Sequence, residues 1–435
     1  MVLLAVLCIG WLLAVTAWAE LLARPPGRPR RLFYAGLVVT AGMLPLLSND
    51  LFSLLAQASL SRQGQDVFGS AAAYRNSPWF AWIGARWRES PSPYGPVTLL
   101  AAWPGSLVGS NPFLADGSLK ISWGLALVAV FELSQRRFRE GPHFQTMLWL
   151  NPLLLVEGIG QLHPDLLGAL LITTGLLLRR RSPGPGGALS WAMATLCKLN
   201  LALTVPWFAL VATRTWAQRL RRVAVLAGVF AVVAVLAYAP FWRGPETLAG
   251  QWRSLRVSTL VPGGTLVDVA GAVAGALAGE PSHAGRTVEE FDASQQAVRA
   301  QAWRIAQAIA ALIALAAIVP LGLRLLRRQD EEWLAVATGG FVVAIVTLAS
   351  PKFQSWYLLA AVPFFALRCP PTWRRWWVWA VGTSVTPEFQ HILPRSSPLY
   401  VPASLGTLAS VVIFLCWFRG RFWAGDREEG AAAAG

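Results

Sequence analysis

Acidic residues are scarce in this chain of 435 residues, which has 22 aspartates and glutamates against 37 lysines and arginines. Charged residues make up only 14% of the sequence, whereas about a quarter is usual in soluble globular proteins. Hydrophobic residues make up 55%, and the mean hydropathy is +0.49. This composition argues against an ordinary soluble domain. Because apolar runs near bilayer length recur along the whole chain, it predicts an all-α polytopic membrane protein.

Cysteine, histidine and lysine are also rare, and the usual cofactor motifs are missing. The four cysteines lie in or beside apolar runs with no CxxC spacing, so neither a disulfide framework nor a metal site is predicted. His163 alone does not make a zinc ligand set. No Walker loop, GxGxxG strand motif, HExxH or GxSxG occurs in a usable context. We therefore expect no cofactor and no metal requirement.

The net charge of +15 comes almost entirely from arginine and is concentrated in short loops between apolar runs. That placement is the positive-inside pattern of cytoplasmic loops, and it argues against nucleic acid as the partner. The membrane bilayer is the partner that the pattern predicts. The basic clusters occupy residues 24–31, 136–139, 179–181, 214–222, 324–328 and 368–375.

Counted from these basic loops, the chain forms one integral membrane domain over residues 1–435 with about 13 crossings. We expect a first helix at about 2–22, retained rather than cleaved as a signal peptide, and a second at about 32–48. The first external loop would cover 49–118, the second 242–300, and a cytoplasmic tail 419–435. The second loop would end in a helical stretch at 287–303. The further crossings would lie at 119–135, 223–241, 301–323, 333–349, 356–368, 376–392 and 399–418.

Three apolar stretches need a special interpretation, because a single full crossing by any of them would place an arginine cluster on the external side. Residues 94–109 contain two prolines, and we interpret them as re-entrant or surface-lying. Residues 144–178 must cross the membrane from the cytoplasmic side and return to it, with a polar turn at 158–165 facing outside. Residues 188–213 satisfy the charge rule as two short spans that meet near Lys198, although a single long helix remains an alternative.

Asp50 lies where the second apolar run ends and a short interfacial helix is expected to begin. A carboxylate at a membrane edge is costly and tends to mark chemistry. Helix capping, with Ser48 as N-cap, explains it too, and the two roles are compatible. If the substrate is a sugar on a lipid phosphate, the leaving group needs little protonation. One carboxylate can then serve as general base for the acceptor hydroxyl. A single base without a nucleophile predicts inversion at the anomeric carbon.

The assignment of loops from the arginine clusters also places several other polar residues on the external side, where they could converge over one cavity. His163 and Asp165 fit either a capped polar turn or sugar and acceptor contacts. Lys198 could snorkel to an interface or face a cavity. Lys352 suits an anionic ligand such as a lipid phosphate. His391 comes out on this side as well. In the first loop, three residues could stack on sugars and bind phosphate, or anchor the loop at the headgroups: Arg86, Arg88 and Tyr94.

Three segments together resemble a known family. The first runs from Ser48-Asn-Asp-Leu-Phe-Ser-Leu-Leu-Ala-Gln57 through Ser77-Pro-Trp-Phe80 to Arg86-Trp-Arg-Glu-Ser-Pro-Ser-Pro-Tyr-Gly-Pro96. The second joins Asn151-Pro-Leu-Leu-Leu-Val-Glu157 to Gly160-Gln-Leu-His-Pro-Asp165. The third is Ser350-Pro-Lys-Phe-Gln-Ser-Trp-Tyr-Leu358. They are similar to segments of polyprenol-phosphomannose-dependent α-1,6-mannosyltransferases of the GT-C superfamily.

The resemblance implies a GT-C-like helix bundle that transfers mannose from a polyprenyl phosphate to a glycan outside the plasma membrane. In actinobacteria, the acceptor that the resemblance implies is the α-1,6-mannan backbone of lipomannan-type glycolipids. It implies Asp50 as catalytic base. Its segments add four residues to the candidate substrate-binding set: Asn49, Gln57, Trp356 and Tyr357. The sequence departs from the family pattern at three places: Gln161, Pro164 and the Asp-Val-Phe at 66–68.

Other functions remain alternatives. The first is a lipid-linked sugar transporter or flippase, for which charges near the bilayer midplane and inverted repeats would be expected. The others are a GT-C enzyme for another sugar, such as arabinose, and a glycan polymerase or ligase of different mechanism.

Overall fold

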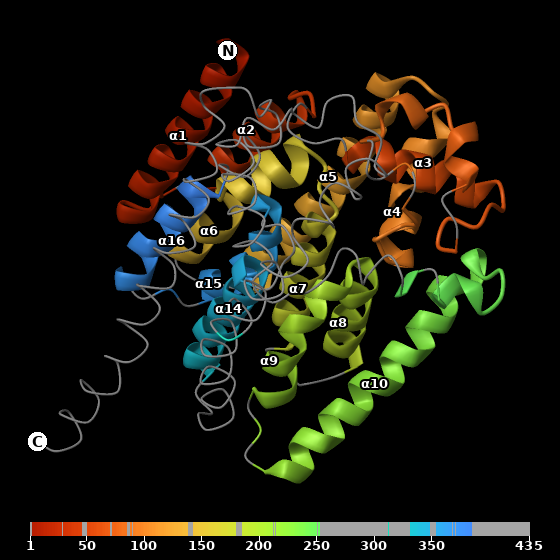
Figure 1. The fold of residues 1–435 in the computed structure, drawn as a ribbon. Coiled ribbons are helices and arrows are strands. Elements are labelled where there is room, and N and C mark those ends of the chain that lie inside the picture. Colours follow the sequence, from red (N-terminus) through yellow and green to blue (C-terminus); the bar gives the residue numbers. More distant parts are fainter. Residues whose placement is uncertain are drawn as a thin grey trace, which may run out of the picture.

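The structure is a computed structural model in which helices account for nearly all of the regular structure (Figure 1). It describes residues 2–27, 29–45, 50–69, 72–84, 88, 90–137, 142–179, 185–211, 213, 215–249, 251–252, 312, 331–348, 354–367, 369 and 371–384. No β-strand occurs in these ranges, so the all-α prediction is confirmed for them. The expected helical stretch at 287–303 and the expected segments 301–323, 399–418 and 419–435 lie outside this part, apart from Leu312.

Helix α1 (Val2–Ala23) packs beside α16 (Pro371–Thr383), near the other end of the described chain. The Trp11 indole donates a hydrogen bond to the Gly382 carbonyl at 3.0 Å. The Trp18 indole reaches the Thr146 carbonyl of α6 (Pro142–Trp149), also at 3.0 Å. Buried tryptophans thus join segments distant in sequence, because each places a large apolar ring and one satisfied N–H in the core.

Helix α2 (Pro29–Ala41) is shorter than predicted. The expected helix of residues 32–48 ends at Ala41, and a turn follows in which the Met43 amide donates to the Thr40 carbonyl at 3.1 Å. Gly42 weakens helix propagation at this point. Pro45 disfavours the helical conformation of the residue before it.

Two helices replace most of the predicted first loop. Helix α3 (Asp50–Arg62) begins at Asp50 as expected, but it is not a one-sided interfacial helix. Its polar residues Ser53, Gln57 and Ser61 are buried along with its leucines, since α4 (Pro96–Leu107) packs against it. Most of the stretch 94–109, predicted to be re-entrant or surface-lying, forms this single helix. Short 3₁₀ turns link α3 to α4 at Ala72–Asn76 and Phe80–Trp82. The predicted crossing at 119–135 begins earlier, in α5 (Pro112–Arg137).

The centre of the molecule is a run of helices separated by two breaks. After α6, a π-helical segment (Leu153–Gly160) leads into a turn, and α7 (Asp165–Arg179) returns beside α8 (Pro185–Cys197). The chain breaks again at Lys198 before a 3₁₀ segment (Leu199–Thr204) and α9 (Val205–Leu210). The prediction of two short segments meeting near Lys198 is confirmed, and the single long helix is wrong. The turn at 158–165 is also confirmed, although it is buried among helices.

The remaining described segments pack on this centre. Helix α10 (Trp216–Tyr238) begins before the predicted residue 223 and continues into a 3₁₀ turn (Ala239–Phe241). Helix α14 (Glu331–Leu348) matches the crossing predicted at 333–349. The segment predicted at 356–368 is a 3₁₀ turn (Ser355–Ala360) followed by α15 (Val362–Leu367). The crossing predicted to begin at 376 begins at Pro371, in α16.

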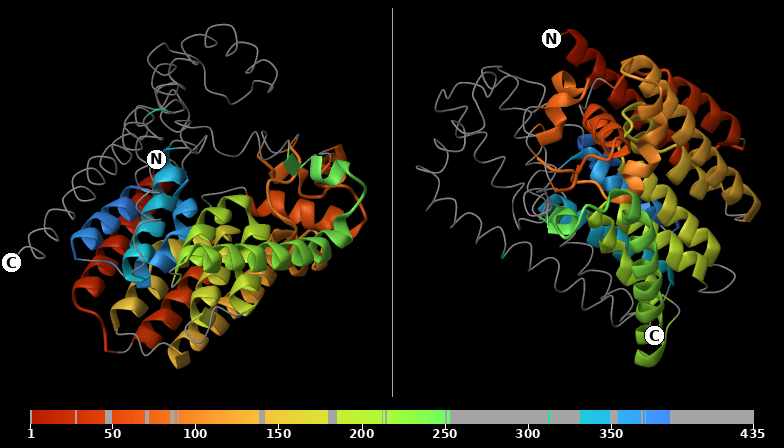
Figure 2. Two further views of the ribbon diagram at one scale, coloured as in Figure 1. Left: turned by 90° about the horizontal axis from the view of Figure 1, so that it is seen from below. Right: turned by 90° about the vertical axis from the view of Figure 1, so that its right-hand side faces the viewer.

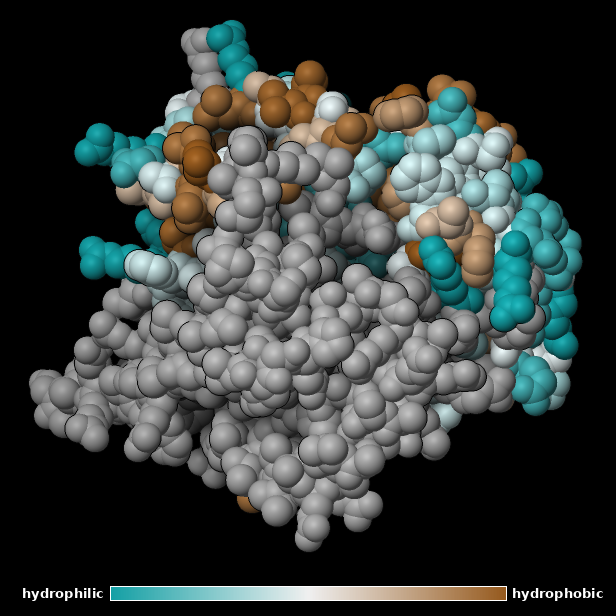
Figure 3. Space-filling model, turned by 45° about the horizontal axis from the view of Figure 1, so that its top comes forward, coloured by the Kyte–Doolittle hydropathy of each residue, from teal (hydrophilic) through white to brown (hydrophobic). Residues whose placement is uncertain are grey.

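Two described helices, α5 and α10, are long and apolar enough to cross a bilayer by length and composition. Both views of Figure 2 show α10 running along the outside of the other helices. Its outward side chains are apolar, with Val232, Val235 and Leu236 between 61% and 71% exposed. On the face shown in Figure 3, hydrophobic residues gather along the upper part of the molecule, and hydrophilic residues lie mainly at the right, with a few at the left margin. Exposed apolar surface of this kind fits a membrane environment.

Candidate catalytic site

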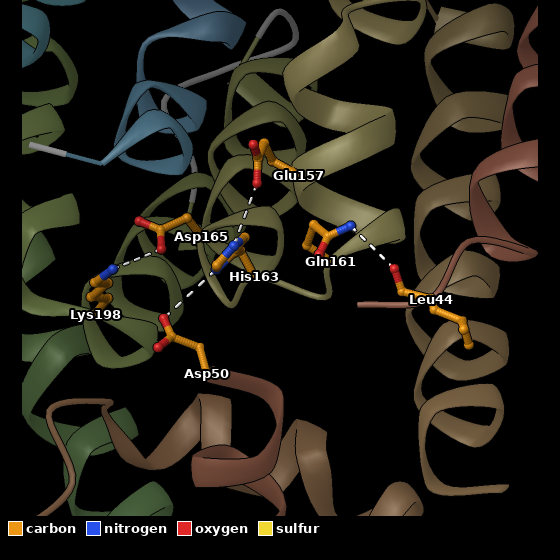
Figure 4. A network of polar contacts seen from close by, with 7 residues as sticks. All are labelled: Leu44, Asp50, Glu157, Gln161, His163, Asp165 and Lys198. Atoms are coloured by element: carbon orange, nitrogen blue, oxygen red, sulfur yellow. Dashed lines mark hydrogen bonds and ion pairs between the residues drawn. The ribbon is translucent and has the colours of Figure 1, made fainter. Parts of the chain in front are cut away.

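Asp50 is the first residue of α3, and its carboxylate lies at the edge of a buried polar cluster. The side chain is 19% exposed, and Oδ2 lies 3.7 Å from Nδ1 of His163 (Figure 4). Because α3 is buried along most of its length, its first turn is held firmly in place. Asp50 is therefore a rigidly placed carboxylate that solvent or a substrate can still reach.

The backbone around residue 162 turns His163 into this cluster. The His163 amide donates to the Glu157 carbonyl at 3.2 Å, which closes the end of the π-helical segment. Leu162 then adopts φ = 55°, a left-handed conformation that is unfavourable for a non-glycine residue. The imidazole is fully buried and stacks on the Trp356 indole, with 3.6 Å between ring centroids and a 16° interplanar angle.

Glu157 lies on the opposite side of the same imidazole. Its Oε2 is 3.4 Å from Nε2 of His163, and its side chain is fully buried. Neither carboxylate oxygen has a hydrogen-bond partner within the described ranges. A buried carboxylate without hydrogen bonds is costly unless an opposite charge compensates it. The π-helical geometry around Glu157 is itself a feature that concentrates at functional sites.

An ion pair lies beside these three residues. The Lys198 ammonium donates a hydrogen bond to Oδ2 of Asp165 at 2.7 Å. Asp165 is fully buried at the start of α7, whereas the Lys198 side chain is 15% exposed at the break after α8. The ammonium also lies over the ring of Tyr357, 4.3 Å from its centroid, and 5.9 Å from that of Tyr94.

The loop before α4 is locked against the end of α8. The Gly95 amide donates to the Cys197 carbonyl at 2.8 Å, and the Thr98 hydroxyl donates to the same oxygen at 3.0 Å. A Cβ on Gly95 would lie 1.9 Å from the Leu196 carbonyl oxygen, so the close approach requires glycine. This contact brings Tyr94 to the cluster.

The Tyr94 phenol is buried and remains protonated. Burial raises the pKa of Tyr94 well above its usual value, and the nearby carboxylates of Asp50 and Asp165 raise it further, Asp50 also by accepting a hydrogen bond. Tyr94 is therefore a permanent hydroxyl donor at the edge of the site.

Three residues expected to converge on one side, Asp50, Asp165 and Lys198, do lie in one cluster. Four other candidate residues join them there: Tyr94, His163, Trp356 and Tyr357. Gln57 is buried and accepts a hydrogen bond from the Ser92 hydroxyl at 2.7 Å, which gives it a role in holding the loop. Arg88 donates to the carbonyls of Ile83 and Ala81, so its guanidinium closes its own loop.

Four other predicted residues lie outside the described ranges: Asn49, Arg86, Lys352 and His391. In contrast, sequence reasoning missed Glu157. Its signal was a lone acidic residue inside the apolar run 153–160, which is costly in such a setting. Glu157 and Asp165 share the cluster of Asp50, so three carboxylates lie together there. No group of three or more residues suited to a metal ion was found in the described part.

An apolar cavity of about 760 Å³ adjoins the break that carries Lys198. The cavity is lined by residues on both sides of that break, Leu196 and Leu199. The C-terminal half of α10 and the loop at Gly95 line it as well. The α10 contribution is Phe230, Ala234, Val235 and Tyr238. Lys198 itself is not among the lining residues, so the cavity adjoins the chain on either side of Lys198, while the ammonium lies on Asp165. The apolar lining suits a hydrocarbon chain.

Comparison with known proteins is consistent with this cluster. The family model described as alpha-(1->6)-mannopyranosyltransferase, N-terminal domain, matches residues 1–214. This range contains six residues of the site: Asp50, Tyr94, Glu157, His163, Asp165 and Lys198. The chain is 28% identical over 227 residues to alpha-(1->6)-mannopyranosyltransferase A of Corynebacterium glutamicum, covering 46% of this chain and 45% of the relative.

Two further relatives match shorter segments. Identity to alpha-(1->6)-mannopyranosyltransferase A of Mycobacterium tuberculosis is 28%, over 41% of this chain and 35% of the relative. Identity to alpha-(1->6)-mannopyranosyltransferase B of C. glutamicum is 34%, over 34% of this chain and 27% of the relative. The matched segments therefore cover less than half of each of these curated relatives.

Proposed function

We propose that this chain is a membrane-embedded mannosyltransferase, because residues 1–214 match the model of the alpha-(1->6)-mannopyranosyltransferase N-terminal domain and the chain is similar to enzymes of that name. The donor is mannose carried on a polyprenyl phosphate, and the acceptor is an α-1,6-mannan or related glycolipid. The site faces the extracytoplasmic side of the plasma membrane, in a multi-pass chain of about 13 crossings as the arginine pattern predicts.

The placement of Asp50 carries this proposal. Its carboxylate starts a buried helix, is 19% exposed, and lies against a buried histidine. Asp50 removes the proton from the acceptor hydroxyl as that oxygen attacks the anomeric carbon. The sugar–phosphate bond breaks on the opposite face, and its electron pair leaves with the phosphate. The geometry needs no nucleophilic residue, so the configuration at the anomeric carbon inverts.

The donor occupies the neighbouring ion pair and cavity. Lys198, whose side chain is 15% exposed, binds the phosphate, since charge-assisted hydrogen bonds to phosphate oxygens are strong. The polyprenyl chain lies in the apolar cavity between α8 and α10. Tyr94 and Tyr357 flank the ammonium and present aromatic faces that suit a sugar ring.

A transporter is the competing function from another class. It would require the charged residues to line a path that opens alternately to the two sides. The cluster observed here is buried beneath packed helices, with Asp165, His163 and Glu157 fully enclosed. A rigid, mostly enclosed cluster with one reachable carboxylate favours catalysis.

The decisive variant is Asp50→Asn, assayed for mannose transfer from polyprenyl phosphomannose in membrane vesicles. We expect a loss of about 100-fold or more, the contribution typical of a general base. The matched control is Asp66→Asn, because Asp66 accepts hydrogen bonds from two amides of its own loop, those of Phe68 and Gly69. Retention of wild-type activity by Asp50→Asn would exclude Asp50 as the base.

The same assay tests the metal expectation. With Lys198 to bind the phosphate, we expect transfer to continue in EDTA. Complete loss in EDTA, restored by a divalent cation, would contradict this donor site.

A further inference from the structure

Tyr94 connects the apolar cavity to the catalytic cluster, because its backbone and its side chain have different surroundings. Its two neighbours in the chain, Pro93 and Gly95, both line the cavity. Its phenol lies in the cluster, where the hydroxyl donates a hydrogen bond to the Asp50 carboxylate. A change in the backbone at this position therefore moves a group that contacts the proposed base.

Gln251 is a polar residue of the cavity wall that contacts this backbone. Its side-chain amide is buried, and Nε2 donates a hydrogen bond to the Tyr94 carbonyl at 3.2 Å. Its amide oxygen accepts a hydrogen bond from the Tyr238 hydroxyl of α10. Both Gln251 and Tyr238 line the cavity. One amide thus links the α10 wall of the cavity to the loop that carries Tyr94.

The orientation of the Tyr94 peptide group depends mainly on this amide. The Ser92 hydroxyl also lies 3.3 Å from the Tyr94 carbonyl oxygen, but it is closer, at 2.7 Å, to Oε1 of Gln57. A hydroxyl has one hydrogen to donate, and the shorter contact takes it. Within the described part, Gln251 is therefore the principal donor to the Tyr94 carbonyl.

The cavity is accessible to a hydrocarbon chain from the outside of the helices. Three of its lining residues are well exposed, Val235 at 71%, Leu248 at 49% and Trp242 at 47%. Both views of Figure 2 show the end of α10 beside the first-loop segments, and the rings of Tyr238 and Phe68 lie 5.6 Å apart there. A volume of about 760 Å³ is that of an ordinary small-molecule pocket, so it holds only part of a polyprenyl chain.

We propose that Gln251 is a positioning residue that couples the filling of this cavity by the donor's hydrocarbon chain to the placement of the Tyr94 hydroxyl beside Asp50. The proposal rests on the proposed function. A chain in the cavity packs against Pro93, Gly95 and the Gln251 amide together, so it restricts the backbone that these three residues surround. Binding energy from a part of the substrate remote from the reacting atoms then raises the rate of the chemical step.

The test compares two donors that share the mannosyl phosphate and differ in the chain, which is farnesyl in one and butyl in the other. The butyl chain is too short to fill the cavity, and its donor is soluble enough to reach saturation. In the wild type, kcat with the farnesyl donor should exceed kcat with the butyl donor by about tenfold, the upper net worth of one neutral hydrogen bond. Gln251→Met, which keeps the length of the side chain and loses both hydrogen bonds, should remove most of that difference by lowering kcat for the farnesyl donor alone.

The matched control is Gln63→Met, because the exposed Gln63 amide donates to the Ser59 hydroxyl in the last turn of α3, at 3.4 Å. Both kcat values should stay at the wild-type level in this control. An equal loss of kcat for the two donors in Gln251→Met would show a merely structural role. A change confined to KM would show that the cavity holds the donor without affecting the chemical step. Either result would overturn the proposal, as would wild-type values of kcat for both donors.

A second measurement needs neither mannose transfer nor a variant that folds. In lipid nanodiscs, saturating farnesyl phosphate should slow hydrogen exchange of the wild-type Gly95 amide, which donates to the Cys197 carbonyl at 2.8 Å, more than saturating butyl phosphate does. Gln251→Met should lose this difference. Equal exchange with the two phosphates in the wild type would overturn the coupling. If farnesyl phosphate slows exchange while neither mannosyl donor is used, the proposed function fails and the coupling between cavity and loop stands.

Discussion

Replacing Lys198 by methionine should destabilise the protein by breaking its pair with Asp165. The ammonium lies 2.7 Å from Oδ2 of a carboxylate that is fully buried, and the other oxygen, Oδ1, has no hydrogen-bond partner in the described part. Removing one member of a buried pair typically costs about 3–5 kcal/mol because the remaining charge is left uncompensated. Against a total stability of about 5–15 kcal/mol, that loss is large.

The double variant Lys198→Met/Asp165→Asn tests the reason for this loss. With the uncompensated charge removed, most of the free energy of unfolding should return, because replacing both members of a buried pair is often close to neutral. Unfolding is measured in detergent micelles with denaturant. A single variant Lys198→Met within about 1 kcal/mol of the wild type would refute the reasoning.

The chain provides a matched control for binding. Lys120 and Asp116 form a second buried pair at 2.9 Å, four residues apart in α5. If Lys198 binds the donor phosphate, Lys198→Met/Asp165→Asn should raise KM for the donor roughly tenfold or more, the worth of a hydrogen bond to a charged group. The corresponding double variant of Lys120 and Asp116 should leave that KM unchanged. An equal effect from both pairs would exclude a specific phosphate site at Lys198.

Two other changes test the loop before α4. Gly95→Ala would place a Cβ 1.9 Å from the Leu196 carbonyl oxygen. We therefore expect a lower melting temperature and about 1–3 kcal/mol of destabilisation. The control Gly124→Ala, which adds a Cβ in open space, should leave the stability unchanged or raise it slightly. Because the pKa of Tyr94 is raised, the folded state keeps the phenolic proton that the unfolded chain loses near pH 10. Stability should therefore be intact below about pH 10 and fall as pH rises further, and Tyr94→Phe should flatten that fall in a pH series of unfolding measurements.

Much of the helical order was predictable because arginine and proline mark the ends of apolar runs. The break at Lys198 followed from arginines on both flanks of 188–213 and is confirmed at that residue. The helix start at Asp50 followed from the end of an apolar run. Where prediction failed, packing had overridden local pattern. Helix α3 looked amphipathic, yet its polar residues are buried against α4, which no periodicity in α3 alone can reveal.

The sequence predicted which residues form much of the site, but it did not predict which side chains contact each other. Asp50, His163, Asp165 and Lys198 were expected on one side, and the structure brings them together. Their pairing depends on the π-helical segment and on the left-handed Leu162, two backbone irregularities without a sequence signature strong enough to predict them. Glu157 was missed for the same reason, because its position in an apolar run gave no direction for its side chain.

The central claim is that this chain transfers a sugar from a polyprenyl phosphate with inversion at the anomeric carbon, and that Asp50 is the general base. Purified protein should be given radiolabelled polyprenyl phosphomannose of defined β configuration and a synthetic α-1,6-dimannoside, followed by linkage and anomer analysis of the product. We predict an α-1,6-linked trimannoside from the wild type and none above background from Asp50→Asn. A β-linked product, or equal yields from the two proteins, would contradict the account.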